Sequence, residues 1–467
     1  MATTVFFGII LLSVWLALRR AGAAKGKSAH DYFVASRQFG GLLVFFLTAG
    51  EIYSIGTMIG FPGGIYAKGP TYGIWFLGYI LLAYPIMYFM GPQIWRAGKR
   101  YNAVTMPDLL KGHFRNRFLE VVAAATAILF LVPWGQLQFT GLVVALHGLG
   151  WAFAPWVLVA ISAALAFLYI AISGVRSTAA IAVLKDIIMI GAIIVTGVAV
   201  LWQFDVKQVF DAANAQVRNQ MNPTELRFSI STILFQSLGF VCVPMLTQFL
   251  FTAKSDQTIR KAQIPMPLYM FMYPFLVLAS YYAISANLHL ASPNDAFIVA
   301  AVQLLPGWLL GLVAAGAALS GLLVLAGLCL AIGPLVCRNL MPHTPESQQK
   351  KASRVVVVIF LLASMALTLL TPNLMLVLIN TAYFGFTQFF PSIFAVLFLR
   401  NVNPVALAVG MLVGQAAAIY ADYAGVKFGG INIGLICLGL NVLIVFVGTL
   451  LFRPRVATTP IYRHAVE

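Results

Sequence analysis

The feature that most constrains this chain is the recurrence of long apolar segments along nearly its whole length. Of 467 residues, 61% are hydrophobic and only 9% are charged, against about 25% charged in an average soluble protein. About 20 consecutive apolar residues suffice to cross a bilayer as a helix. We therefore predict an all-α integral membrane protein with thirteen transmembrane helices. They lie near residues 4–19, 40–66, 72–95, 119–147, 152–172, 178–203, 228–252, 264–290, 307–337, 355–371, 374–399, 403–423 and 431–452.

The distribution of basic residues predicts which side of the membrane each loop faces. The net charge of +16 could indicate nucleic-acid binding. With the N-terminus outside, however, 23 of the 29 Lys and Arg fall in cytoplasmic segments, five fall in outer loops, and Lys185 lies in a span. This bias follows the positive-inside rule. We expect a multi-pass protein surrounded by lipid, with its C-terminus in the cytoplasm and no nucleic-acid partner.

The remaining composition argues against a processed leader and against an enzyme. The first apolar stretch lacks a basic segment before it, and Arg19 and Arg20 follow it, so we predict an uncleaved span. The four cysteines fall in predicted spans, and the six histidines are scattered at span ends and in loops. We find no cluster of catalytic or metal-binding groups and expect no cofactor, apart from a possible coupling Na⁺.

Two of the predicted spans are interrupted by helix-breaking residues. The second contains Gly56 and Pro62, and the seventh contains Gly239 and Pro244. Because they are five spans apart, they enter the membrane from opposite sides. Paired breaks of this kind are typical of inverted-repeat transporters, which bind ions and solutes at the freed backbone groups. The alternative is that these residues only permit close helix packing.

Glu51 lies within the first interrupted span, in the stretch FFLTAGEIYSIG. A charged group at the centre of a spanning helix costs about 3 kcal/mol on insertion scales. Such residues usually serve function. We therefore expect Glu51 to take part in binding a coupling cation or proton.

Several segments together resemble the sodium/solute symporter family. They are DYFVASRQFGGLLVFFLTAGEIYSIGTMIGFPGGIYAKG at 31–69, RAGKRYNAVTMPDLLKGHF, and PMLTQFLFTAKSDQTIRKA at 244–262. Within the family, LVPWGQLQFTG, VLKDIIMI and SDQTIRKAQIPMPLY are most similar to bacterial monocarboxylate permeases. The resemblance implies cation-coupled uptake of a small organic acid, such as lactate or pyruvate, across the bacterial inner membrane.

The resemblance also implies a domain organisation. It predicts a single transmembrane domain over 1–467 with a LeuT-type five-plus-five inverted-repeat core, formed by repeats at 40–203 and 228–399. The span at 4–19 and the two spans within 403–452 would be additional. Other small-solute symporters of the family, including amino acid carriers, remain open, as does a transporter-like channel or sensor. The oligomeric state is not predicted.

The family's sodium site maps onto this chain incompletely. Its backbone carbonyls correspond to Ala49 and Ile52, but its paired hydroxyls correspond to Leu323 and Val324, which carry none. Shifting the alignment by three residues recovers a single hydroxyl, Ser320. Since a hard cation needs several oxygen ligands, a sodium ion here would be underliganded. The coupling ion could be H⁺ or Na⁺.

Lys185 and Asp186 form a second departure, because the family more often has Thr before this Asp. In this respect the chain resembles proton-coupled amino acid transporters of the same superfold, in which a lysine ammonium replaces the sodium ion. We therefore place both residues among the candidate coupling groups, with Glu51. A permanent tie of Lys185 to Glu51 or to Asp186 is the structural alternative.

Candidate substrate contacts come from the two breaks and from the helices expected to face them. Their amide, hydroxyl and aromatic groups suit a small polar solute, although the same groups also hydrogen-bond and pack between helices. The candidates are Tyr53, Trp134, Gln138, Gln236, Ser237, Phe240, Thr387 and Gln388.

Overall fold

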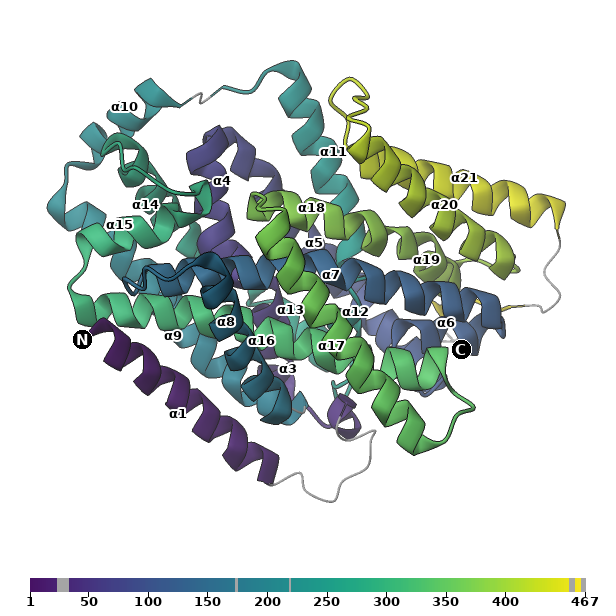
Figure 1. Cartoon of the computed structure of the whole chain (residues 1–467). Helices are drawn as coiled ribbons and strands as arrows, with labels where there is room; N and C mark the ends of the chain where they lie inside the picture. Colours follow the sequence, from purple (N-terminus) through teal and green to yellow (C-terminus); the bar gives the residue numbers. More distant parts are fainter. Residues whose placement is uncertain (23–32, 173–174, 218–219, 453–457, 463–467) are drawn as a thin grey trace.

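The computed structural model describes residues 1–22, 33–172, 175–217, 220–452 and 458–462. Within these ranges the chain forms helices joined by loops (Figure 1). Pairing of the β type is limited, in the described residues, to isolated bridges between Phe39 and Ala253 and between Phe428 and Ile431. The prediction of an all-α protein is confirmed.

The helices follow one another in this order. They are α1 (Ala2–Gly22), η1 (Ala35–Arg37), α3 (Gly41–Ile52), η2 (Gly56–Gly60), α4 (Phe61–Lys68), α5 (Pro70–Arg100), α6 (Met106–Phe114), α7 (Arg117–His147), α8 (Pro155–Ile172), α9 (Val175–Gln203), α10 (Val206–Gln216), α11 (Pro223–Phe240), α12 (Pro244–Leu250), α13 (Asp256–Gln263), η3 (Met266–Met272), α14 (Tyr273–Ser285), η4 (Pro293–Asp295), α15 (Ala296–Leu304), α16 (Gly307–Pro334), η5 (Leu335–Leu340), α17 (Glu346–Leu370), α18 (Met375–Phe386), η6 (Thr387–Phe389), α19 (Phe390–Phe398), α20 (Pro404–Tyr423) and α21 (Ile433–Leu451).

The lengths and composition of these helices fit a multi-pass membrane protein. Among the described residues, ten helical segments are long and apolar enough to cross a bilayer, and two bent pairs bring the number to as many as twelve. The remaining expected span, at 152–172, corresponds to the shorter apolar helix α8. The exact number of thirteen therefore stays a prediction.

Both predicted helix breaks are present. The first separates α3 from η2 and α4, with a bend of 40°, and the second separates α11 from α12, with a bend of 46°. Pro244 begins α12, and proline cannot donate the backbone hydrogen bond that a continuous helix needs at that position. The breaks thus leave backbone groups free inside the molecule.

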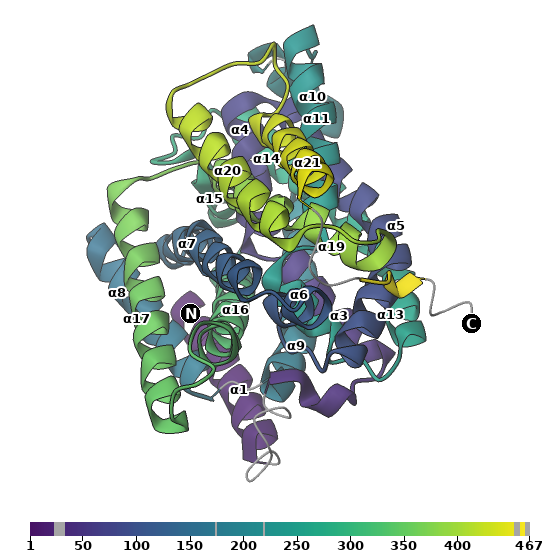
Figure 2. The same ribbon diagram turned by 90° about the vertical axis from the view of Figure 1, so that its right-hand side faces the viewer.

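Helix α16 lies deep in the molecule because small residues let its neighbours approach closely. Gly316 faces the backbone of α9 at Ile188 and Met189, and Gly321 faces α7 at Leu142. Small residues at such contacts are common between membrane helices. Three helices lie at the periphery, with α1 on one side and the pair of α20 and α21 on the other (Figure 1, Figure 2).

Candidate functional site

The two helix breaks meet at a small buried cavity of about 20 Å³. This volume holds roughly one water molecule, so binding of an organic solute requires the cavity to widen. Five helical segments contribute its walls: α3 with η2, α5, α7, α11 with α12, and α18. The lining residues are Glu51, Ile52, Ser54, Gly56, Thr57, Phe76, Tyr79, Trp134, Leu137, Phe240, Val243, Leu246, Ile379 and Tyr383.

Glu51 lies at the last turn of α3, on the wall of this cavity, and is only 4% exposed. The indole Nε1 of Trp134, on α7, donates a hydrogen bond of 3.0 Å to its Oε1. Tyr79 and Tyr383 also line the cavity, and their ring centroids are 5.6 Å apart. The carboxyl group therefore lies in aromatic and aliphatic surroundings, where its protonation responds strongly to any charge brought close.

Lys185, on α9, reaches the first helix break with its ammonium group. Its Nζ donates to the carbonyl oxygen of Tyr53 at 2.7 Å and to that of Gly50 at 3.4 Å. The side chain is fully buried. A cation of the protein itself thus occupies the carbonyl-rich end of α3.

Among the described residues, Lys185 forms its ion pair with Asp186 and not with Glu51. The hydroxyl of Tyr269, in η3, donates to Asp186 Oδ2 at 2.8 Å. The Tyr269 ring stacks on Tyr53 with centroids 4.5 Å apart. These contacts connect α9, η3 and the first helix break through a continuous set of buried side chains.

Leu323 and Val324, the aliphatic residues at the expected sodium-site positions, lie near the end of α3. Leu323 and Val324 line a second cavity of about 10 Å³ together with Gly50 and Glu51. Leu323 Cδ2 lies 3.2 Å from the point that a Cβ atom on Gly50 would occupy. The aliphatic groups and the ammonium of Lys185 therefore flank the same turn of α3.

The other candidate cation ligands are Ala49, Ser320 and Ile52, which either form hydrogen bonds within their own helices or line the cavity. The carbonyl of Ala49 accepts the backbone N–H of Tyr53 at 2.8 Å. Ser320 donates its hydroxyl to the carbonyl of Gly316 at 2.7 Å. Ile52 lines the cavity beside Glu51.

The eight substrate candidates divide into two groups. Trp134 and Phe240 line the cavity. The other six make contacts elsewhere: Tyr53 stacks on Tyr269, Gln138 donates to the carbonyl of Trp134, Gln236 donates to Asn380, Ser237 donates to the carbonyl of Leu234, Thr387 donates to the carbonyl of Phe235, and Gln388 accepts from Asn441 of α21.

Sequence reasoning did not single out Tyr79, Tyr383 or Tyr269. Tyr79 and Tyr383 lie in spans rich in aromatic residues, where nothing in the pattern separates a cavity residue from a packing residue. Tyr269 lies within SDQTIRKAQIPMPLY, a segment noted for its resemblance and not for this side chain. The sequence pointed to Tyr269 only through the segment that contains it.

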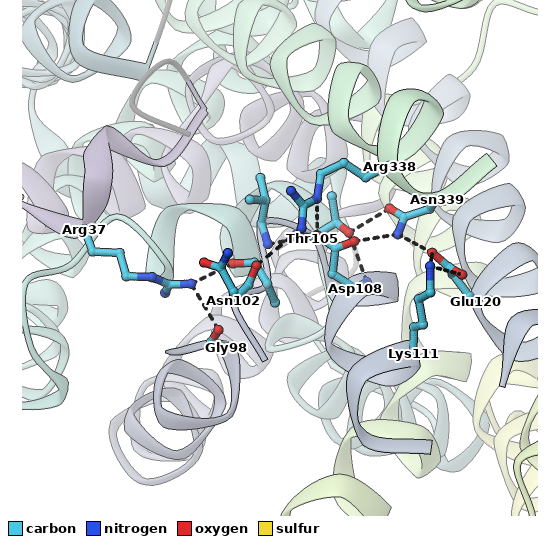
Figure 3. Close-up of polar contacts among 11 residues, drawn as sticks. Arg37, Gly98, Asn102, Thr105, Asp108, Lys111, Glu120, Arg338 and Asn339 are labelled. Carbon is cyan, nitrogen blue, oxygen red and sulfur yellow. Dashed lines mark hydrogen bonds and ion pairs between the residues drawn. The ribbon is translucent and has the colours of Figure 1, made fainter. Parts of the chain in front are cut away.

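A second polar cluster, with buried carboxylates and partly exposed basic side chains, joins α6, α7 and η5 (Figure 3). Asp108 Oδ2 accepts from Arg338 Nε at 2.7 Å, and Asp108 Oδ1 accepts from Asn339 Nδ2 at 2.8 Å. The same Asn339 amide donates to Glu120 at 3.0 Å. Lys111 and Arg117 complete the cluster with ion pairs to Glu120 at 3.2 and 2.6 Å.

This cluster gives a physical reason for an uncharged amide at Asn339, which follows Arg338. Asn339 lies between two carboxylates, and Thr105 donates to its Oδ1 at 2.8 Å. A third carboxylate at this position would face Asp108 and Glu120 and repel both. Beside the cluster, Arg37 fixes the end of α5 by donating to the carbonyls of Gly98 and Ala103 (Figure 3).

Comparison with known proteins places this arrangement in a class of membrane transporters. The sodium:solute symporter family matches residues 32–414, and the chain belongs to this family. An uncharacterized symporter of Bacillus subtilis is 26% identical, with 97% of each chain covered. A monocarboxylate transport permease protein of Rhizobium johnstonii is also 26% identical, over 79% of this chain and 77% of its own length.

A solved structure supports the fold. A Na⁺-coupled sialic acid symporter in a substrate-bound, outward-open state matches with a TM-score of 0.77 and 16% identity, covering 97% of this chain and 98% of that chain. The chain therefore has a LeuT-like fold. It is a transporter rather than an enzyme, as its relatives are.

Proposed function

We propose that this protein is a proton-coupled symporter that takes up a small monocarboxylate, such as lactate or pyruvate, across a bacterial inner membrane. The N-terminus faces outward and the C-terminus faces the cytoplasm, because this orientation leaves 23 of 29 basic residues inside. The inverted repeats are the segments 40–203 and 228–399, and each contains one helix break.

The observation that carries the choice of ion is the position of Lys185. Its ammonium donates to the carbonyls of Gly50 and Tyr53, at the end of the first broken helix. Leu323 lies against the same turn and offers no oxygen ligand. With an internal cation in place and aliphatic groups beside it, transport does not need sodium at this position.

Glu51 supplies the proton coupling through simple electrostatics. A substrate carboxylate in the cavity would lie close to the Glu51 carboxylate. Two like charges 4 Å apart repel by about 4 kcal/mol at an effective dielectric constant of 20. Binding of the anion therefore favours the protonated form of Glu51, so that one proton accompanies each anion. Trp134 holds the carboxyl group in place in either form.

The substrate class is supported by two observations. One relative is a monocarboxylate transport permease protein. The cavity is narrow and lined mainly by aromatic and aliphatic side chains, with Ser54 and Thr57 adding hydroxyl groups at the break. Such walls suit a compact solute with an apolar body and one polar end.

The proposal is tested by uptake of labelled pyruvate and lactate into proteoliposomes, with a pH gradient and a sodium gradient imposed separately. We expect the pH gradient alone to drive accumulation and sodium to have no effect. Accumulation that requires sodium would refute proton coupling, and accumulation of neither acid would refute the substrate class.

A substitution separates coupling from binding. Glu51→Gln fixes the carboxyl group in a neutral form, so we expect exchange of internal for external substrate to continue while accumulation driven by the pH gradient is lost. Asp211→Asn is the matched control, because Asp211 lies exposed on α10. Full accumulation by Glu51→Gln would contradict the role given to Glu51.

A further inference from the structure

A groove of about 1320 Å³ lies between the junction of α6 and α7 and the pair of α20 and α21. In both views α20 and α21 lie side by side at one edge of the molecule (Figure 1, Figure 2). The groove walls are mostly apolar and open to the surroundings, with Leu443 56% and Leu451 70% exposed. Such walls within a membrane protein face lipid chains.

One end of the groove is cationic. Arg115 lines it and is exposed, and its guanidinium makes no hydrogen bond or ion pair with another described residue. The nearby polar side chains Asn116 and Asn403 are occupied as helix caps, since their Oδ1 atoms accept backbone N–H groups of α7 and α20. The N-termini of α7 and α20, which carry partial positive charge, therefore lie at the groove together with Arg115.

An anionic lipid matches both parts of the groove. A soluble anion would use the cationic end but would gain nothing from the long apolar walls. A zwitterionic lipid would cover the walls, but the positive charge of its own headgroup would offset its phosphate and weaken the attraction to the guanidinium. Basic pockets between membrane helices on the cytoplasmic side suit lipid phosphate groups, and arginine pairs with phosphate through two parallel hydrogen bonds.

We propose that this groove binds an anionic phospholipid, with the phosphate at Arg115 and the acyl chains along α20 and α21. The assignment to the inner leaflet rests on the orientation proposed above. The binding itself does not depend on the transported solute, so failure of the uptake experiments would leave it intact.

The test is native mass spectrometry of the purified full-length protein in an uncharged detergent. Phosphatidylglycerol and phosphatidylcholine with identical acyl chains are titrated separately. We expect the protein to bind phosphatidylglycerol more tightly than phosphatidylcholine. Arg115→Gln should bind phosphatidylglycerol about fivefold more weakly than the unsubstituted protein. Arg115→Lys should retain the binding. Arg354→Gln is the matched control, since Arg354 is exposed on α17 and outside the groove.

A second variant tests the apolar walls. Val447→Trp fills part of the groove and should weaken the binding of both lipids. The proposal is overturned if Arg115→Gln binds phosphatidylglycerol like the unsubstituted protein, or if Arg354→Gln weakens binding equally. It is also overturned if excess inorganic phosphate displaces the lipid, or if the groove proves to join two copies of the chain in a dimer that Val447→Trp dissociates.

Discussion

Replacing Lys185 by methionine removes the ammonium group but keeps a side chain of similar length. In the folded protein, Lys185 donates to two backbone carbonyls at the first helix break and pairs with Asp186, with no exposure of the lysine side chain. The variant therefore leaves Asp186 as a buried charge, with the hydroxyl of Tyr269 as its remaining hydrogen-bond donor. We expect a large loss of stability.

The magnitude follows from the ion pair. Removing one partner of a buried ion pair costs about 3–5 kcal/mol, whereas removing both charges is often nearly neutral. Lys185→Met should therefore reduce the free energy of unfolding by about 3–5 kcal/mol. The double variant Lys185→Met with Asp186→Asn should recover most of this loss, because no uncompensated charge is then buried.

The assay is equilibrium unfolding in mixed micelles with increasing fractions of denaturing detergent. Lys207→Met is the control, because Lys207 is exposed on α10 and its replacement should change stability little. The reasoning is refuted if Lys185→Met loses less than about 1 kcal/mol, or if the double variant is no more stable than the single one. Neither Lys185→Met nor the double variant should accumulate substrate, since both lack the ammonium group of Lys185.

Three further outcomes are expected from the same unfolding measurement. Gly385→Ala would force a Cβ atom into the Phe130 ring and should cost about 1–3 kcal/mol, whereas Gly439→Ala, with no atom within 4 Å, should cost far less. Burial, with Arg100 nearby, lowers the pKa of His113 from 6.5 to about 4. The unfolded chain then binds the proton more readily, so stability should fall as the pH drops from 6.5 toward 4, and His113→Asn should flatten that slope. Asn339→Leu removes the amide shared by two carboxylates and should cost about 1–3 kcal/mol; an unchanged midpoint would contradict the network.

The local properties of this protein could be read from its sequence. Spans follow from runs of apolar residues, because each segment must satisfy its own backbone hydrogen bonds inside a bilayer. The breaks follow from glycine and Pro244, and both occur where predicted. Glu51 and Lys185 were recognisable because a charge within an apolar span is rare.

The sequence does not show which residues Glu51, Lys185 and the substrate candidates contact. The sequence left open whether Lys185 pairs with Glu51 or with Asp186. In the structure Lys185 pairs with Asp186, and its ammonium also donates to the carbonyl of Tyr53 at the end of α3. The sequence also grouped Gln388 with the substrate candidates, although η6 directs it toward Asn441 on α21. Six of the eight substrate candidates lie in contacts away from the cavity walls.

The physical reason is that membrane helices are apolar on all sides. In a soluble protein the spacing of apolar residues shows which face of a helix is inward, but lipid and core demand the same residue types. The sequence alone therefore determined that the chain crosses the membrane many times as helices, where two of these helices break, and that Glu51 and Lys185 are buried. Only the tertiary structure, through the rotation and packing of the helices, decided that Glu51 meets Trp134 and that Lys185 occupies the carbonyls of the first break.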